Sequence, residues 1–241
     1  MSTKTPLGRV LIVEDEPSIA RGLKFNFEQD GYEATVATDG PTALTHFEPG
    51  RTRPDCVILD LMLPGMSGYD ICETVRRRDS HVPILVLSAR TLAEDKARAF
   101  DVGCDQYVPK PFALEELLSR VRNLISRRGK TPPVSTPDDD PILLGESRID
   151  FRTHRLTRDG EEFELTKMEV ALLRYLLDHE GEVLSRSQIT RDVWEQDAAV
   201  STRSIDNFVL RLRKLIEPNP SRPQHLLSVR GTGYRLLRRP A

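Results

Sequence analysis

The 241-residue sequence has no long hydrophobic run and only three cysteines. No apolar stretch approaches the roughly 18 residues that a membrane span needs, and residues 1–6 contain no apolar segment, so we expect no membrane helix and no signal peptide. An odd number of cysteines without C-x-x-C spacing fits packed side chains in a reducing compartment, the cytoplasm. The five histidines show no metal-ligand spacing either.

The charge of the chain is unevenly distributed. The net charge is -2, but the segment from residue 201 onward has nine Lys/Arg against two acids, so it carries +7 and the rest of the chain carries -9. A basic block on an acidic chain favours a polyanion as partner. The alternative is a solvated basic tail. The contents of 38% hydrophobic and 30% charged residues suit soluble globular domains, and the length fits two of them.

Residues 7–128 are predicted to form the first domain, in which short apolar runs alternate with amphipathic ones. The expected strands are Arg9–Val13, Glu33–Val36, Cys56–Asp60, Pro83–Leu87 and Gln106–Val108, and the expected helices are Pro17–Gln29, Pro41–Glu48, Ser67–Asp79, Leu92–Val102 and Ala113–Arg127. Five such units predict an α/β fold, a doubly wound five-stranded parallel sheet. Ligands of such sheets bind at the carboxyl ends of the strands.

Residues 129–140, rich in proline and aspartate, are predicted to be a linker, and residues 141–239 a second domain. This domain opens with strand-like pieces at residues 142–144, 147–150 and 155–157 and an Asp-Gly hairpin turn. Two capping boxes, Thr166-x-x-Glu169 and Ser185-x-x-Gln188, begin helices, and a third helix covers residues 202–216. Two strands near 226–229 and 234–237 complete an α+β winged helix.

Polar side chains end four of the apolar strands of the first domain. Glu14 and Asp15 follow one strand, Asp60 ends another, and Ser88 and Lys110 follow two more. If the strand order is 2-1-3-4-5, Glu14, Asp15 and Asp60 lie close together. Their mutual repulsion must be offset, and a hard cation such as Mg²⁺ would do so. A carboxylate beside Mg²⁺ can become an aspartyl phosphate. An acid at a strand end is by itself more often a helix cap or turn residue; the combination is the stronger indication.

These motifs resemble two-component response regulators of the OmpR/PhoB winged-helix class over nearly the whole length. The motifs that carry the resemblance are residues 10–16 (VLIVEDE), 59–65 (LDLMLPG), 88–89 (SA) and 107–112 (YVPKPF). The resemblance implies a CheY-like receiver with Asp60 as phosphoacceptor. It implies that Asp15 binds Mg²⁺ directly, that Glu14 does so through water, and that the Met62 carbonyl completes the ligands. Lys110 would bind the phosphoryl group.

The resemblance also assigns a switch and a dimer. Ser88 and Tyr107 match the hydroxyl and aromatic switch pair, and the Lys110-Pro111 peptide would be cis. Phosphorylation would shift a population between two states. The face that forms a symmetric homodimer in the family matches Lys96, Asp105, Glu116 and Arg120 here, although Glu116 and Arg120 are also placed to pair with each other. Gln106 replaces the usual second acid, which puts one interchain pair in doubt.

The third helix of the second domain is predicted to read DNA. Its core face is Ile205, Phe208, Val209, Leu212 and Ile216, and its outer face is Arg203, Asn207, Leu210, Arg211 and Lys214. Arg211 and Asn207 suit base edges, whereas Lys214, Arg213 and Arg203 suit phosphates.

Three further features concern the DNA-binding domain. The resemblance makes Arg230, at the wing tip, a minor-groove contact. Phe208 and Leu210 stand where the family often has a histidine and an arginine, so Phe208 is expected in the core and Leu210 against a thymine methyl. In the family, the loop that corresponds to residues 195–200 touches RNA polymerase.

We therefore expect a transcription regulator, not a substrate-turnover enzyme. Asp60 would take phosphate from a sensor histidine kinase, the receiver would dimerise, and paired winged helices would bind promoter half-sites. One alternative is a phosphotransfer or scaffolding protein whose basic domain serves another polyanion or a protein. Another is DNA binding independent of phosphate, against which the intact acid pocket argues.

Overall fold

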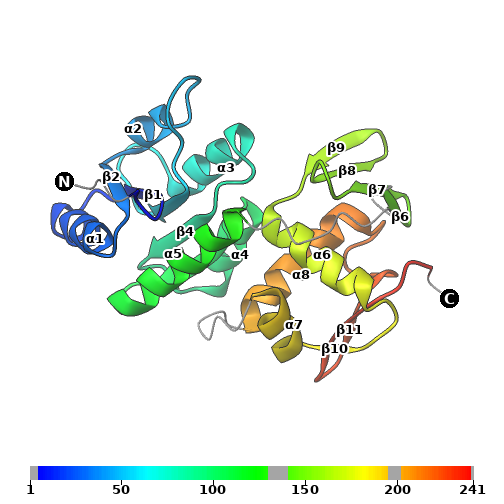
Figure 1. Ribbon diagram of the computed structural model, residues 1–241. Helices are drawn as coiled ribbons and strands as arrows, with labels where there is room; N and C mark the ends of the chain where they lie inside the picture. Colours follow the sequence, from blue (N-terminus) through cyan, green and yellow to red (C-terminus); the bar gives the residue numbers. More distant parts are fainter. Residues whose placement is uncertain (1–4, 130–140, 195–201, 240–241) are drawn as a thin grey trace. The chain divides into compact units, whose positions relative to one another are not determined.

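The computed structural model describes residues 5–129, 141–194 and 202–239 and consists of two compact units, Met1–Thr131 and Pro132–Ala241 (Figure 1). The predicted linker lies almost entirely outside the described residues, and so do residues 195–200, the expected polymerase contact. Within the described ranges, no helix combines the length and apolar character that a bilayer crossing requires.

The first unit is built on a parallel five-stranded sheet. Its strands are β1 (Arg9–Val13), β2 (Glu33–Ala37), β3 (Cys56–Asp60), β4 (Ile84–Ser88) and β5 (Gln106–Pro109), in the order β2-β1-β3-β4-β5. The central strands are buried on both faces, which is why they appear in the sequence as continuous apolar runs. The predicted α/β fold is confirmed. The register pairs Val13 with Leu59, so the residues that follow β1 lie beside the end of β3.

Five helices accompany this sheet: α1 (Pro17–Gln29), α2 (Gly40–Thr45), α3 (Gly68–Arg78), α4 (Ala93–Asp101) and α5 (Leu114–Gly129). α1 and α5 cover one face, where Phe27 and Leu117 are completely buried in one apolar cluster (Figure 1). α2 is shorter than the expected helix over residues 41–48. It begins at the cap Asp39, whose carboxylate accepts the Thr42 amide at 2.8 Å, and its regular turns end at Thr45.

The second unit has two antiparallel sheets and three helices, which is consistent with the predicted winged helix. One sheet is β6 (Ile142–Leu144), β7 (Ser147–Asp150), β8 (Arg155–Arg158) and β9 (Glu161–Glu164), and the other has the order β10 (Leu184–Ser185), β12 (Gly233–Leu236), β11 (Leu226–Val229). The helices are α6 (Lys167–Asp178), α7 (Arg186–Val193) and α8 (Thr202–Ile216). Strands β9 and β10 were not predicted as such, because β9 is polar and β10 has two residues.

Local capping determines where α6 and α7 begin. Both predicted capping boxes are formed. The Glu169 side chain accepts a hydrogen bond from the Thr166 amide, and the Gln188 side chain accepts one from the Ser185 amide. Gly233 allows the wing to close on this part of the fold, because a Cβ at this position would lie 2.0 Å from the Leu184 carbonyl oxygen. The helices and the wing are therefore held in one unit by backbone contacts as well as by side chains.

Candidate functional site

Three carboxylates meet at the carboxyl ends of β1 and β3. One oxygen each of Glu14, Asp15 and Asp60 lies within 4.8 Å of the others, as the strand order predicts. Glu14 and Asp60 are buried, at 2% and 6% exposure, whereas Asp15 is exposed. A cation that prefers oxygen ligands and keeps part of its water shell, such as Mg²⁺, fits two buried carboxylates beside a solvent-facing one.

Lys110 supplies a positive charge to the two buried acids. Its Nζ lies 2.7 Å from Oε2 of Glu14 and 2.6 Å from Oδ2 of Asp60. Burial raises the pKa of Glu14 above its ordinary value, although the hydrogen bond from Lys110 opposes the rise. Burial lowers the pKa of Lys110, but its bonds to Asp60 and Glu14 outweigh this and leave its pKa raised. The Lys110–Pro111 peptide is cis, as expected.

The loop after β3 holds the remaining oxygen of Asp60. Oδ1 accepts the Met62 amide at 2.8 Å, and Met62 is 55% exposed. Gly68 permits α3 to pack against this loop, since a Cβ there would lie 2.5 Å from the Asp60 carbonyl oxygen. Both carboxylate oxygens of Asp60 are therefore oriented by donors, one from the backbone and one from Lys110.

Ser88 and Tyr107 are joined through the backbone of Arg90. The Ser88 hydroxyl is completely buried and accepts the Arg90 amide at 3.2 Å, while the Tyr107 hydroxyl donates to the Arg90 carbonyl at 2.7 Å. Burial raises the pKa of Tyr107, partly offset by a hydrogen bond with Ser88. The Ser88 carbonyl also accepts the Lys110 amide at 2.8 Å. The predicted switch pair is thus brought together through the Arg90 backbone, and Ser88 is bonded directly to the backbone of Lys110.

A further network extends from this loop to α3 and was not predicted from the sequence. The Arg90 guanidinium lies 2.9 Å from Oδ1 of Asp95, which also accepts the Tyr69 hydroxyl at 3.3 Å. Burial and the Asp95 charge raise the pKa of Tyr69 to about 12. Arg98 stacks over the Tyr69 ring, 4.4 Å from its centroid. These residues come from separate segments, so no local sequence pattern connects them.

The expected dimer residues make contacts within the chain. Asp105 is 5% exposed, and its Oδ2 binds Arg76 at 2.5 Å as well as the Ile84 amide. Arg120 is also buried and bonds to Glu116 at 2.7 Å and to the Gln106 amide oxygen at 3.0 Å. Asp105 and Arg120 are therefore both engaged inside the unit.

Lys96 and Glu116 are the more accessible members of the expected dimer set. Lys96 is half-buried, with its ammonium 5.8 Å from the centroid of the Tyr107 ring. The Glu116 side chain is 40% exposed while it holds Arg120. Lys96 therefore lies beside one member of the switch pair.

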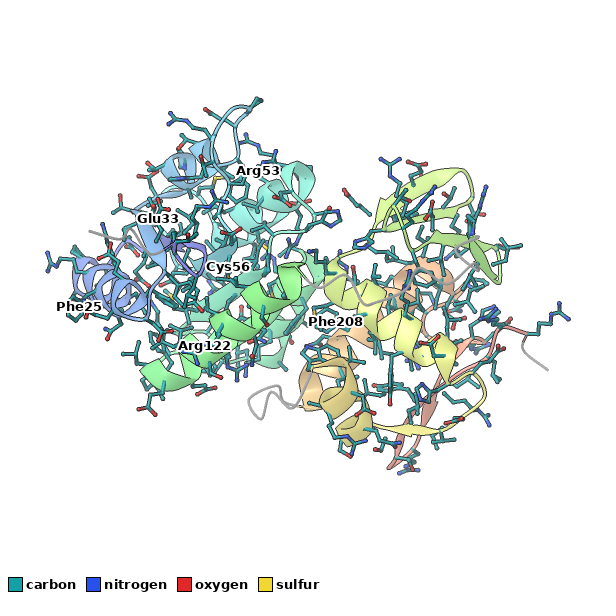
Figure 2. All side chains as sticks on the ribbon, viewed as in Figure 1. Phe25, Glu33, Arg53, Cys56, Arg122 and Phe208 are labelled. Atoms are coloured by element: carbon teal, nitrogen blue, oxygen red, sulfur yellow. The ribbon has the colours of Figure 1, made fainter. Side chains whose placement is uncertain are left out.

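The basic helix α8 has the predicted two faces. Its five apolar core positions are buried, among them Phe208, which packs against Trp194 with ring centroids 5.4 Å apart (Figure 2). Leu210 and Lys214 are exposed and Asn207 is partly buried, whereas the Arg203 side chain lies outside the described part of the chain. The departure at Phe208 is thus a core contact, as expected.

Two arginines of α8 make contacts that the sequence did not indicate. Arg211 places Nε 2.6 Å from Oε1 of the fully buried Glu169 on α6. Arg213 donates to the Leu226 carbonyl at 2.9 and 2.7 Å and to the Ser228 hydroxyl at 2.9 Å. Its guanidinium therefore ties α8 to the wing strand β11, although a phosphate contact was expected.

The wing places Arg230 at its exposed tip, next to Gly231 with a φ of +74°. Behind it, the Tyr234 hydroxyl donates to Asp206 at 2.6 Å, and Arg186 bonds to the same carboxylate oxygen at 2.8 Å. These bonds join the wing, α7 and α8. A basic wing tip and a basic helix are consequently connected through these bonds.

Comparisons with known proteins agree with both halves of this description. Residues 10–122 match the response regulator receiver domain, and residues 160–236 match the C-terminal domain of transcriptional regulatory proteins. The sensory transduction protein RegX3 of Mycolicibacterium smegmatis is 44% identical over 227 residues, covering 94% of this chain and 98% of that protein. The DNA-binding response regulator MtrA of the same organism is 39% identical and covers 94% and 96%.

A solved structure is similar over the same range. A mutant form of RitR aligns with a TM-score of 0.70 at 26% identity, covering 95% of this chain and 98% of that one. The matched families carry a receiver and a DNA-binding domain, which are the two units of this fold. The chain belongs to the OmpR/PhoB class of two-component response regulators and is a DNA-binding transcriptional regulator with a receiver domain.

Proposed function

We propose that Asp60 accepts a phosphoryl group from a sensor histidine kinase. A carboxylate oxygen attacks the phosphorus of a kinase phosphohistidine; the O–P bond forms as the P–N bond breaks, and the electron pair of the broken bond goes to the imidazole nitrogen. Supporting the proposal, the Lys110 ammonium lies within 2.7 Å of two buried carboxylates at the open edge of the sheet. The chain turns over no separate substrate in this proposal.

Each residue of the pocket has a role in this step. Glu14, Asp15, Asp60 and the Met62 carbonyl would hold Mg²⁺, which would offset the negative charge of the carboxylates and the phosphoryl oxygens. Lys110 transfers its hydrogen bond from Asp60 to a phosphoryl oxygen. The Ser88 hydroxyl loses the hydrogen bond that it accepts from the Arg90 amide and donates to the phosphoryl group instead.

The release of Ser88 changes the surroundings of Tyr107. Both side chains bond to the Arg90 backbone, so movement of that loop frees the Tyr107 hydroxyl to turn inward. We propose that this shifts the population toward a homodimer formed through α4, β5 and α5. Lys96 and Glu116 are then the interchain charge pair, because Asp105 and Arg120 keep their contacts inside the chain.

For DNA recognition, we assign base edges to Asn207 and Arg211, with Leu210 against a thymine methyl. Lys214 and Arg203 bind phosphates, and Arg230 enters the minor groove from the wing tip. For the described side chains, which do not include that of Arg203, these assignments are supported by the partly or fully exposed stripe of α8 and the exposed wing tip. We place the protein in the cytoplasm, since its three cysteines form no disulfide.

Phosphorylation by a small phosphodonor with Mg²⁺, measured by mass, tests the central assignment. The parent protein is expected to gain one phosphoryl group and to sediment as a dimer, and a chelator of Mg²⁺ is expected to prevent both. Asp60→Asn is expected to gain none. Asp70→Asn, which changes an exposed acid on α3, serves as the matched control and is expected to behave as the parent. Equal incorporation into Asp60→Asn and the parent would overturn the assignment.

A further inference from the structure

Glu169 is a buried carboxylate with two separate contacts. It lies in the first turn of α6 and is 0% exposed. Oε2 accepts the Thr166 amide at 2.8 Å and completes the capping box. Oε1 lies 2.6 Å from Nε of Arg211 on α8, an ion pair whose geometry is not that of an aligned hydrogen bond. One oxygen therefore serves its own helix and the other serves the basic helix.

Arg211 lies at the border between the core and the surface of α8. Its side chain is 20% exposed. On the helix it neighbours Asn207 and Lys214, four residues before it and three after, and Leu210 precedes it. Nε of Arg211 is thus held by the buried carboxylate of Glu169, while Arg211 belongs to the outward-facing stripe of α8.

We infer that Glu169 is a positioning residue for DNA sequence recognition and that it acts by holding Nε of Arg211. This inference rests on the proposed function, in which Arg211 reads a base edge. An arginine recognises a base through a planar fork of donors, so its orientation decides whether it reads a base or only contacts a phosphate. A fixed negative charge at Nε restricts the rotamers of the side chain before DNA arrives.

The electrostatic effect of the ion pair has the opposite sign for affinity and for selectivity. Glu169 subtracts one charge from a surface that binds a polyanion, so it weakens sequence-independent attraction. Without that charge, the guanidinium is drawn to the nearest phosphates and leaves the base edge. Removal of the charge therefore strengthens binding to arbitrary DNA and weakens the preference for the selected sequence. Damage to the fold would instead weaken both.

Glu169→Gln separates these effects from helix capping. The chain itself uses glutamine at the same capping position, since the Gln188 side chain accepts the Ser185 amide at 3.2 Å at the start of α7. The variant therefore keeps the cap and the size of the side chain but loses the charge. Trp194, the single tryptophan, is 1% exposed, and its fluorescence verifies that the second unit is folded.

The experiment uses the full-length protein and two duplexes, one selected by the parent from a random pool and one scrambled. We expect Glu169→Gln to bind the scrambled duplex at least as tightly as the parent and to lose about tenfold in the ratio of the two affinities, the scale of one bidentate base contact. Glu162→Gln is the control. It removes an exposed acid that pairs with Arg155 across strands β8 and β9 of the second unit, so the net charge changes by the same amount as in Glu169→Gln, and the ratio of the two affinities is expected to be unchanged.

Each other outcome has a definite meaning. An unchanged affinity ratio in Glu169→Gln, or a parallel loss on both duplexes, overturns the inference and leaves Glu169 a purely structural residue. An equal fall of the ratio in Glu162→Gln also overturns it, because net charge would then be the cause. If the parent selects no sequence from the random pool, the proposed DNA recognition fails instead.

Discussion

Replacement of Lys110 by methionine tests the electrostatic description of the acid pocket. Methionine keeps the length and apolar stem of the side chain and removes the ammonium group. The change leaves Glu14 and Asp60 without the cation that lies 2.7 and 2.6 Å away in the parent protein. We expect the receiver to be markedly destabilised at neutral pH.

The size of the effect follows from burial. Loss of one partner of a buried ion pair typically costs about 3–5 kcal/mol, because an uncompensated charge remains in the interior. The side chains of Glu14 and Asp60 are 3% and 7% exposed and that of Lys110 is 17%, so the pair qualifies as buried. Because the pocket is exposed to water at Asp15, we expect Lys110→Met to lower the free energy of unfolding by about 3 kcal/mol, the lower end of that range.

The loss should depend on pH in a defined direction. Burial holds the pKa of Glu14 above its ordinary 4.5, and removal of Lys110 eliminates the interaction that opposes this rise. A group whose folded pKa exceeds its unfolded pKa binds more protons when folded, so the free energy of unfolding falls as pH rises from 4.5 through the folded value. The deficit of Lys110→Met is therefore smaller near pH 5 than near pH 8.

Lys110 itself contributes in another pH range. Its folded pKa lies above the ordinary 10.5 because of Asp60 and Glu14. Its stabilisation is therefore fully present below 10.5 and is lost only as the pH rises through the folded value. Added Mg²⁺ should stabilise the variant more than the parent at pH 8 and so reduce the deficit, because only in the variant does the bound cation replace a missing ammonium charge. At a concentration about 100 times the Kd of the variant, binding stabilises the folded variant by about 2.7 kcal/mol.

The chain carries a separate probe for each unit. Cys56, Cys72 and Cys104 are its three cysteines, all buried in the first unit, so thiol labelling during urea unfolding reports on the receiver (Figure 2 labels Cys56). Fluorescence of Trp194 reports on the second unit and should not change. The control is Lys24→Met, which removes an exposed lysine paired with Glu28 and should cost less than about 0.5 kcal/mol.

Two results would refute this reasoning. A loss below about 1 kcal/mol at pH 7.5 would show that the pocket is solvated well enough to hold both acids without Lys110. An equal loss at pH 5 and pH 8 would show that packing of the lysine stem, not charge, is responsible.

Two further predictions concern α8. Leu210→Arg, at an exposed position, should raise DNA affinity, steepen its salt dependence by about one counterion and relax sequence preference; unchanged slope and preference in salt titrations would contradict this. Arg213→Gln should destabilise the second unit by about 1.5–3 kcal/mol in Trp194 fluorescence, because the Leu226 carbonyl loses a charged donor. For Arg213→Gln, the slope of log DNA affinity against log salt concentration should equal that of the parent. A slope smaller by about one would indicate that Arg213 contacts a phosphate after all.

The acid pocket was predictable because its members follow buried strands. Parallel strands end at one edge, so residues 14, 15, 60, 88 and 110 converge once the strand order is given. The capping boxes at Thr166 and Ser185 were predictable for a similar reason, since both partners lie within one turn. In these cases a local pattern contains the whole interaction.

The partners of isolated charges were not predictable in this way. Arg213 was expected at phosphates, yet it binds the carbonyl of Leu226, thirteen residues later. Asp105 was expected at a dimer interface and is buried against Arg76, twenty-nine residues earlier. A long side chain reaches several acceptors, and which one it meets depends on how helices and strands pack.

The sequence by itself determined the strands of the parallel sheet, the convergence of the acids with Lys110, and the two faces of α8, because each depends on periodicity or on strand ends. Only the tertiary structure decided that Arg90 joins the switch pair to Tyr69, and that Glu169 holds Arg211. The physical reason is distance: local patterns act over a few residues, whereas a buried charge takes its partner from whatever segment the packed core places within about 3 Å.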